Sequence, residues 1–147
     1  MREVNVTLLG VHTDALTVAL RAALGPNKAL GISTYGSARP ISIWLVDNTT
    51  PLDDQLAIVI AQAHDPVFLS VDKATITANG VDMATVHVLA PKSSATVTLV
   101  IGNTPVPVTL TGGVGNITIV STDHAMIPIS VQNPANRTTD TVIVEAI

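Results

Sequence analysis

Histidines are the first residues to consider for catalysis or metal binding, and this chain has four, His12, His64, His87 and His124. They are far apart in the sequence, and none has a second ligand at the spacing that a metal site requires. His64 precedes Asp65, so the pair could form half of a proton relay, but a histidine beside a capping aspartate at a helix end is the simpler interpretation. His87 alternates with valines, and we expect it to face solvent or a neighbouring subunit.

Two groups of acidic and amide residues also have the chemistry of a site. Asp53 and Asp54 are adjacent on a predicted helix, where neighbouring side chains point about 100° apart, so we interpret them as helix-start residues rather than a catalytic pair. Asp72, Asn79 and Asp82 flank a turn and carry the oxygen ligands that calcium prefers. No loop has the dense Asp and Asn pattern of a recognised calcium site, so a structural turn is the preferred interpretation.

One segment is rich in glycine, Gly112-Gly113-Val114-Gly115, but it lacks the Lys and Ser or Thr of a phosphate-binding loop. It lies between predicted strands, and we interpret it as a turn or bulge. The residues therefore predict no catalytic group, no metal ligand and no cofactor, and the protein is expected not to be an enzyme. An enzyme would require a pocket that gathers at least two titratable groups with shifted pKa values.

The chain as a whole, which must position these residues, has an unusual composition. Charged residues make up 12% of the 147 residues, about half the usual share. So few charges predict wide, weakly polar surfaces of the kind that mark association sites. The alternative is a β-rich surface coated with Thr, Ser and Asn.

Net charge and termini exclude several classes of function. The net charge is −4 and the seven Lys and Arg residues are scattered, which argues against nucleic-acid binding. The chain has no cysteine, which excludes a disulfide framework and thiol catalysis. No apolar run is long enough to span a membrane, and the first residues lack the apolar region of a signal peptide. If the protein acts outside a cell, we expect its release by lysis or on a particle.

Residues 1–65 predict a small α/β unit, in which two helices cover one face of a three-stranded sheet. Strands are expected over 4–9, 30–35 and 41–46, the last two forming a hairpin. The helix-start signals comprise Thr13 as a candidate cap of the first helix and, for the second, Thr50 as cap, Pro51 at the first position and Asp53 at the third. The apolar stripe of the second helix is predicted to consist of Leu52, Leu56, Val59 and Ala63, with Ile60 beside it.

Residues 66–147 predict an all-β sandwich of about seven strands, because short β-prone runs are separated by Gly, Pro, Asn or Asp at roughly ten-residue intervals. Pro128 requires an edge position, a bulge or a nitrogen turned away from its partner. The short junction between the two parts favours a fixed domain geometry. The predicted inward residues are Val86, Val88, Val97, Leu99, Ile101, Val106, Val108, Leu110, Ile117, Ile119, Ile127, Ile129, Val131, Val142 and Val144.

The stretch DKATITANGVDMATV, residues 72–86, resembles the opening of bacterial Ig-like domains of the invasin and intimin type, whose repeats use the phrase A-[ND]-G-x-D-x-A-T-V-T-V. It departs from the phrase at His87, where the family has Thr, and the segment Lys92-Ser93-Ser94 lacks the usual Gly-rich continuation. The resemblance implies an Ig-like fold for residues 67–147. The helix over 50–64 followed by Asp65-Pro66 is also similar to segments that lead into Ig-like modules of tailed-bacteriophage virion proteins.

Together these resemblances imply a non-enzymatic bacteriophage virion protein that is made in the bacterial cytoplasm. The expected role is capsid decoration, with residues 1–65 attached to the particle and the Ig-like domain displayed outward. A tail or neck component is one alternative, and a carbohydrate-binding or adhesion module is another, although its only aromatic platforms, Tyr35 and Trp44, lie outside the sandwich. The expected partners are capsid or tail proteins and further copies of the chain in a homo-oligomer or high-copy assembly, with weak binding to host-surface glycans.

Overall fold

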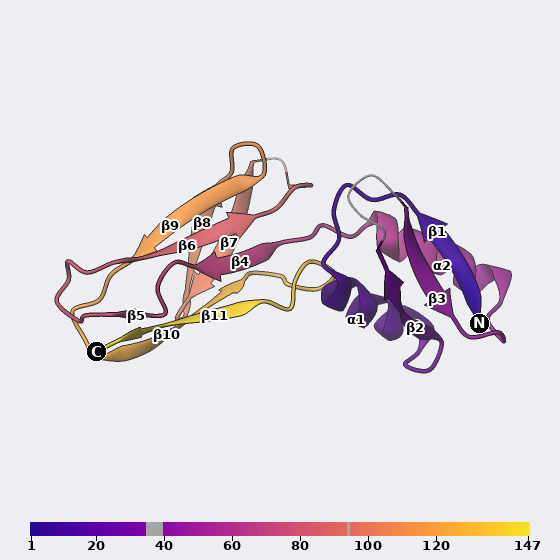
Figure 1. Cartoon of the computed structure of the whole chain (residues 1–147), viewed down its shortest axis with the longest axis horizontal. Helices are drawn as coiled ribbons and strands as arrows, with labels where there is room; N and C mark the ends of the chain where they lie inside the picture. The colour runs from indigo at the N-terminus through magenta and orange to yellow at the C-terminus, as the bar shows by residue number, and fades with distance from the viewer. Residues whose placement is uncertain (35–39, 94) are drawn as a thin grey trace. The chain divides into compact units, whose positions relative to one another are not determined.

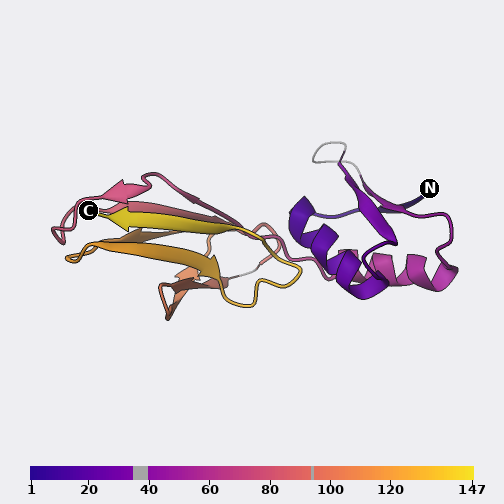
Figure 2. The same cartoon turned by 90° about the horizontal axis from the view of Figure 1, so that it is seen from below.

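The computed structural model describes residues 1–34, 40–93 and 95–147, and within them the chain forms two helices and eleven strands (Figures 1 and 2). This mostly β content agrees with the predicted α+β class. The predicted strand end at Tyr35 and the connection through 36–39 lie outside the described residues, as does Ser94. Two compact units are present: unit 1 contains Met1–Pro66 and Ala135–Thr138, and unit 2 contains Val67–Pro134 and Thr139–Ile147.

Unit 1 has an antiparallel sheet in the order β1-β3-β2, formed by β1 (Arg2–Val6), β2 (Ala29–Ser33) and β3 (Ile41–Leu45). The two helices, α1 (Thr13–Leu24) and α2 (Pro51–Gln62), lie on one face of this sheet, as predicted (Figure 2). They share with it one apolar core. Its buried members are Val6, Leu16, Leu20, Leu24, Ala29, Ile41, Ile43, Leu45, Ala57 and Ala61.

The start of α1 differs from the prediction by one residue. The N-cap is His12 rather than Thr13, because its extended backbone precedes the helix and its ring Nδ1 accepts the backbone N–H of Ala15 at 3.4 Å. Histidine has no strong preference for this position, whereas threonine does. A local capping preference therefore selected the wrong residue.

The inward face of α2 agrees with the prediction only in part. Leu56 and Ile60 pack against the core as predicted. Leu52 and Val59 are 73% and 58% exposed, and Ala63 is exposed as well, whereas Ala57 and Ala61 are fully buried. Apolar side chains occur on more than one side of this helix, so their periodicity did not identify the buried side. The prediction chose the side with the larger side chains. The small alanines lie on the side where α2 packs against α1 and the sheet, while the larger leucine and valine face outward.

Unit 2 consists of two sheets that share one core. The first has the order β4-β6-β9 and contains β4 (Phe68–Val71), β6 (Ala84–Leu89) and β9 (Val114–Ile119). The second has the order β5-β11-β10-β7-β8 and contains β5 (Thr75–Ile76), β7 (Thr96–Ile101), β8 (Thr104–Thr109), β10 (Ala125–Val131) and β11 (Thr141–Ala146). All pairings are antiparallel except that of β5 with β11.

Most of the predicted inward residues of unit 2 are buried. The exceptions are partly buried, and all but Val106 pack against the core: Ile101, Ile117, Ile127, Val142 and Val106. Gly112 and Gly113 form a tight turn with positive φ angles of 61° and 80°, as the glycine-rich segment predicted. Both residues take a backbone conformation that favours glycine.

Pro128 lies in β10, which has β11 on one side and β7 on the other. Its carbonyl accepts the N–H of Gly102 at 2.8 Å, so the backbone polar groups of this residue face β7. The pairing of β10 with β7 begins only at Ile129, opposite Ile101. The proline nitrogen therefore points toward the end of β7 and away from β11. The missing N–H removes no backbone hydrogen bond between β10 and β11, in agreement with the predicted nitrogen turned away from a partner.

Candidate functional site

Two of the histidines meet in the core of unit 1 although 52 residues separate them. The backbone N–H of His12 donates to Nε2 of His64 at 2.9 Å. Because Nε2 accepts this bond, Nδ1 of His64 carries the proton of the neutral ring, and it lies 2.9 Å from the carbonyl oxygen of Asn136. Both side chains are buried. This cluster links two helix ends and places no reactive group at the surface.

Asn136 completes this cluster from a segment distant in sequence. Its Nδ2 donates to the carbonyl of Ile60 in the last turn of α2 at 2.9 Å, and its Oδ1 lies 3.0 Å from Nδ1 of His64. Beside it, Arg137 pairs with Asp65 at 3.2 Å. The segment Ala135–Thr138 thus bonds the C-terminal end of α2 through side chains. Sequence analysis missed its role, because its only local signal is a turn.

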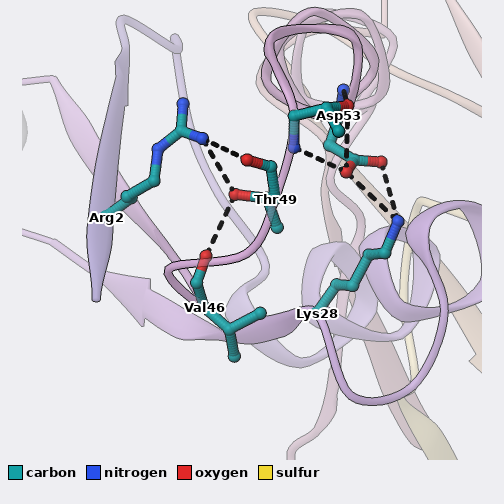
Figure 3. A network of polar contacts seen from close by, with 6 residues as sticks. Arg2, Lys28, Val46, Thr49 and Asp53 are labelled. Atoms are coloured by element: carbon teal, nitrogen blue, oxygen red, sulfur yellow. Dashed lines mark hydrogen bonds and ion pairs between the residues drawn. The ribbon is translucent and has the colours of Figure 1, made fainter.

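The N-terminal end of α2 carries a second polar network (Figure 3). Thr50 and Asp53 form a reciprocal capping box, which confirms the predicted helix start. Lys28 reaches both carboxylate oxygens of Asp53, at 3.1 and 3.2 Å, and Arg2 binds the carbonyl of Thr49 and pairs with Asp54. These contacts hold the helix start, which is the role predicted for the two adjacent carboxylates.

The electrostatics of Asp53 follow from this geometry. Its pKa lies below the ordinary value of 3.8, chiefly because the backbone N–H of Thr50 donates to the carboxylate and secondly because of Lys28. Both contacts favour the charged form. A general acid needs the opposite shift at neutral pH. Asp53 therefore acts as a helix-capping anion.

The turn between Asp72 and Asp82 uses its oxygen ligands internally. Asp72 accepts the N–H of Thr85 at 2.6 Å, and Asp82 accepts the N–H of Thr77 at 2.8 Å and the ammonium of Lys73 at 2.7 Å. Backbone bonding to Thr85 lowers the pKa of Asp72, and Lys73 followed by Thr77 lowers that of Asp82.

Asn79 completes this turn, because its Oδ1 accepts the N–H groups of Val81 and Asp82 at 2.9 and 2.8 Å. In the stretch 72–86, which resembles Ig-like repeats, the side chains of Asp72, Asn79 and Asp82 thus hydrogen-bond to the backbone and fix the shape of the turn. Its carboxylates bind N–H groups and an ammonium instead of converging on a common point. The preferred interpretation as a structural turn follows from these bonds.

The outer face of the β4-β6-β9 sheet carries side chains in ordered rows. His87 is exposed, as predicted, and its Nδ1 lies 2.7 Å from Oδ1 of Asn116 on the neighbouring strand. The adjacent row is apolar and consists of Phe68, Leu89 and Val114, which are paired across the three strands. Leu89 and Val114 are each about half exposed, at 46% and 48%. This face offers contact area and no cluster of titratable groups.

The face of the β1-β3-β2 sheet opposite the helices contains the single tryptophan. Trp44 is partly exposed, and its Nε1 donates to Oγ of Ser33 at 2.8 Å. Beside it, Ser42 is bonded to Glu3 and Asn5. Aromatic and polar side chains therefore share this face, but the indole N–H is already used within the sheet.

The outward face of α2 is the clearest candidate for a binding surface. The side chains that face solvent along it carry no charge: Leu52, Gln55, Val59, Gln62 and Ala63. The acidic residues of the helix, Asp53 and Asp54, are in its first turn and pair with Lys28 and Arg2. We call this surface the α2 face. Exposed, uncharged apolar surface of this kind is typical of sites that bind another protein.

Within residues 1–34, 40–93 and 95–147, no group of three His, Asp or Glu side chains is placed to hold a metal ion. Neither described helix is long and apolar enough to cross a membrane. The chain matches no protein-family model, and no curated protein or solved structure shows significant similarity to it. The candidate surface therefore rests on the residues and their geometry.

Proposed function

We propose that the protein is a non-enzymatic structural component of a bacteriophage virion, a decoration or accessory protein of the capsid. Unit 1 attaches to the particle through the α2 face, and unit 2 is an Ig-like domain displayed outward. The observation that carries this proposal is the α2 face itself. Leu52 and Val59 are large, apolar and exposed on a helix whose charges are all used at its first turn.

The physical argument for attachment concerns the cost of leaving this face in water. Burying a leucine or valine side chain contributes about 1.5–3 kcal/mol, whereas a charged face would lose much of that gain to desolvation. A helix with apolar side chains seven residues apart presents them two turns apart on one face, which suits the grooves of protein surfaces. Leu52 and Val59 have this spacing on the exposed side of α2.

The Ig-like assignment of unit 2 is supported by two features. Its two sheets are ordered β4-β6-β9 and β5-β11-β10-β7-β8, so the chain changes sheet at each step from β4 to β7 and again on either side of β9, as chains of Greek-key sandwiches do. The stretch over 72–86, which resembles bacterial Ig-like repeats, spans β5, the turn that follows it and the start of β6. Displayed sandwiches of this type suit a particle surface because they expose hydroxyl-rich strands, here with few charges.

Binding of the full chain to purified empty capsids and to isolated tails tests the proposal. We expect saturable binding to capsids, which Leu52→Glu or Val59→Glu weakens at least about tenfold through a buried, unpaired charge. Val18→Glu is the matched control, because Val18 is 60% exposed on α1 and adds the same charge to unit 1. Its affinity should stay within about twofold of wild type.

Other outcomes of the same experiment would support one of the alternative functions, a tail or neck component or an adhesion module. Binding to isolated tails but not to capsids would replace decoration by a tail or neck role. Retention on host cell-wall glycans without binding to either particle would support the adhesion module instead. In that case Trp44→Ala should abolish retention, since an aromatic face is the usual sugar platform. Equal capsid binding by all three glutamate variants would exclude the α2 face as the attachment surface.

A further inference from the structure

We propose that β9 is a self-pairing edge, through which two copies of the chain join their β4-β6-β9 sheets across a two-fold axis at Ile117. The inference concerns unit 2 and goes beyond attachment through the α2 face. It rests on the backbone N–H and C=O groups of β9 that are not hydrogen-bonded to a neighbouring strand. β9 is the last strand of its sheet in the order β4-β6-β9, and Figure 1 shows it on the far side of β6 from β4.

Known hydrogen bonds define which backbone groups of β9 face outward. Gly113, just before the strand, accepts the N–H of Ala90 at 2.8 Å and therefore faces the β6 side. Val114 instead exchanges bonds of 2.8 and 3.2 Å with Thr111, on the opposite side. Because successive residues of a strand alternate in direction, the N–H and C=O groups of Asn116 and Thr118 also face away from β6. These four groups form the open edge.

The other edge strands of unit 2 limit pairing by different means. In β8, Leu110 donates its N–H toward β7, to Ala95 at 2.7 Å, so the odd-numbered residues of this strand face outward. Two of these outward positions are Pro105 and Pro107, which have no N–H to offer. Prolines at such positions are a known protection of edge strands.

The remaining two edge strands are β5, which is short, and β4, whose outward N–H group is bonded to a side chain. β5 has only two residues. In β4, the outward N–H of Leu69 donates to the carboxylate of Asp140 at 3.0 Å. Among the described edge strands, β9 thus has outward donors and acceptors at Asn116 and Thr118 for which the structure shows no partner, beyond the end at Val114 that is bonded to Thr111.

The sequence of β9 makes this edge complementary to itself. In an antiparallel pair centred on Ile117, Asn116 lies opposite Thr118 of the second copy, and their outward N–H and C=O groups form four hydrogen bonds. No residue from Val114 to Ile119 is charged, so the two strands meet without like-charge repulsion. Oδ1 of Asn116 is engaged by His87, which leaves its amide nitrogen for the hydroxyl of the opposite threonine.

The half-buried position of Ile117 adds to this pairing. It packs partly against the core of unit 2, and in the paired state it meets its own symmetry mate on the same side of the joined sheet. A short strand pair buries less area than the roughly 800 Å² per partner of a standard interface. The isolated dimer is therefore weak, and it becomes important where many copies are held close together.

The mass of the full chain in solution, followed by sedimentation equilibrium up to ~1 mM, tests the inference. We expect a concentration-dependent dimer that Thr118→Pro weakens at least about tenfold, because it removes an outward N–H without touching the ladder to β6. Thr75→Pro is the matched control, because Thr75 is exposed in the edge strand β5 and faces away from β11, to which its neighbours Ala74 and Ile76 are bonded; this variant should dimerise like wild type. A monomer throughout this range, or equal weakening by both variants, would refute the pairing.

Two charge variants test the register and do not depend on how proline is tolerated. Asn116→Lys with Thr118→Glu places opposite charges across the two-fold axis, whereas Asn116→Lys with Thr118→Lys places like charges there. The first should dimerise at least about tenfold more tightly at low salt, and the difference should shrink in high salt. Equal association of the two variants would contradict the proposed register.

The capsid assay separates this inference from the proposed function. Loss of capsid binding in Leu52→Glu together with a normal dimer would support attachment and self-pairing as independent properties. If Thr118→Pro abolished capsid binding and the wild-type chain remained monomeric, β9 would accept a strand of the particle, and pairing with a second copy would be wrong.

Discussion

Asn136 illustrates how a single residue stabilises a helix that is remote in sequence. Its backbone is left-handed, with φ of 55°, and its side chain reaches both Ile60 and His64. Asparagine tolerates this conformation better than most residues, since its short amide bonds locally. The residue thus combines a backbone role and a side-chain role.

Replacing Asn136 should separate these two roles. Asn136→Gly removes the side-chain bonds and should destabilise unit 1 by about 1–3 kcal/mol, whereas Asn136→Ala adds about 1 kcal/mol for the left-handed backbone. Urea unfolding followed by the fluorescence of Trp44, the single tryptophan and a residue of unit 1, measures both. Asn133, which has the same φ of 55° but belongs to unit 2, is the control position. Equal stability of wild type and both Asn136 variants would show that the segment contributes nothing to α2.

Acid should weaken unit 1 through Asp53. Its folded-state pKa is lowered from 3.8, so the folded state binds fewer protons than the unfolded state, and stability rises with pH in this range. The contribution is complete above about pH 5 and is lost as the pH falls through the lowered pKa. In Asp53→Asn, the Trp44 unfolding midpoint should therefore fall less steeply with decreasing pH than in wild type. Gln55→Asn, an exposed change in α2 that involves no titratable group, should leave the slope as it is.

At the scale of elements, α2 shows that apolar periodicity can be ambiguous. The helix has apolar side chains on most of its circumference. Tertiary packing buries Ala57 and Ala61, with Leu56 and Ile60 partly buried beside them, and leaves Leu52 and Val59 exposed. The outward orientation of Leu52 and Val59 is what makes the α2 face available to a partner. From the same orientation we expect substitutions on the two sides of α2 to differ in their effect on the stability of unit 1.

Enlarging the buried side of α2 should be costly, and the same change on its outer side should not be. Ala61→Leu overpacks the contact with α1 and should destabilise unit 1 by about 1–3 kcal/mol. Ala63→Leu, two residues later and exposed, should change stability by no more than about 0.5 kcal/mol. Trp44-monitored urea unfolding compares the two. A greater loss for Ala63→Leu would restore the originally predicted inward stripe.

At the scale of the whole molecule, the chain passes between the units three times, after Pro66, after Pro134 and after Thr138. The segment Ala135–Thr138 belongs to unit 1, but both strands that flank it, β10 and β11, belong to unit 2. Folding of unit 2 thus restricts the ends of a segment that unit 1 needs. The two units are expected to be coupled in stability through this connection.

A charge in the core of unit 2 tests this coupling. Leu99 is fully buried, and Leu99→Asp should unfold unit 2 because it leaves an unpaired charge in an apolar core. We expect the Trp44 transition of unit 1 to persist at a lower urea midpoint, since Ala135–Thr138 then has unfolded flanks. Circular dichroism should report loss of strand signal in the same variant. An unchanged Trp44 midpoint would mean that unit 1 does not depend on the segment.

Local sequence signals were sufficient for much of the architecture. The capping box at Thr50 and Asp53, the turn at Gly112-Gly113, the order of elements in unit 1 and most inward valines of unit 2 follow from short-range preferences, because caps, turns and strand alternation depend on neighbouring residues. Only the tertiary structure decided the pairing of His12 with His64 and Asn136, the outward face of α2 and the open edge of β9. These depend on which distant segments meet, and no local preference distinguishes two apolar faces of a helix or identifies the strand that remains last in its sheet.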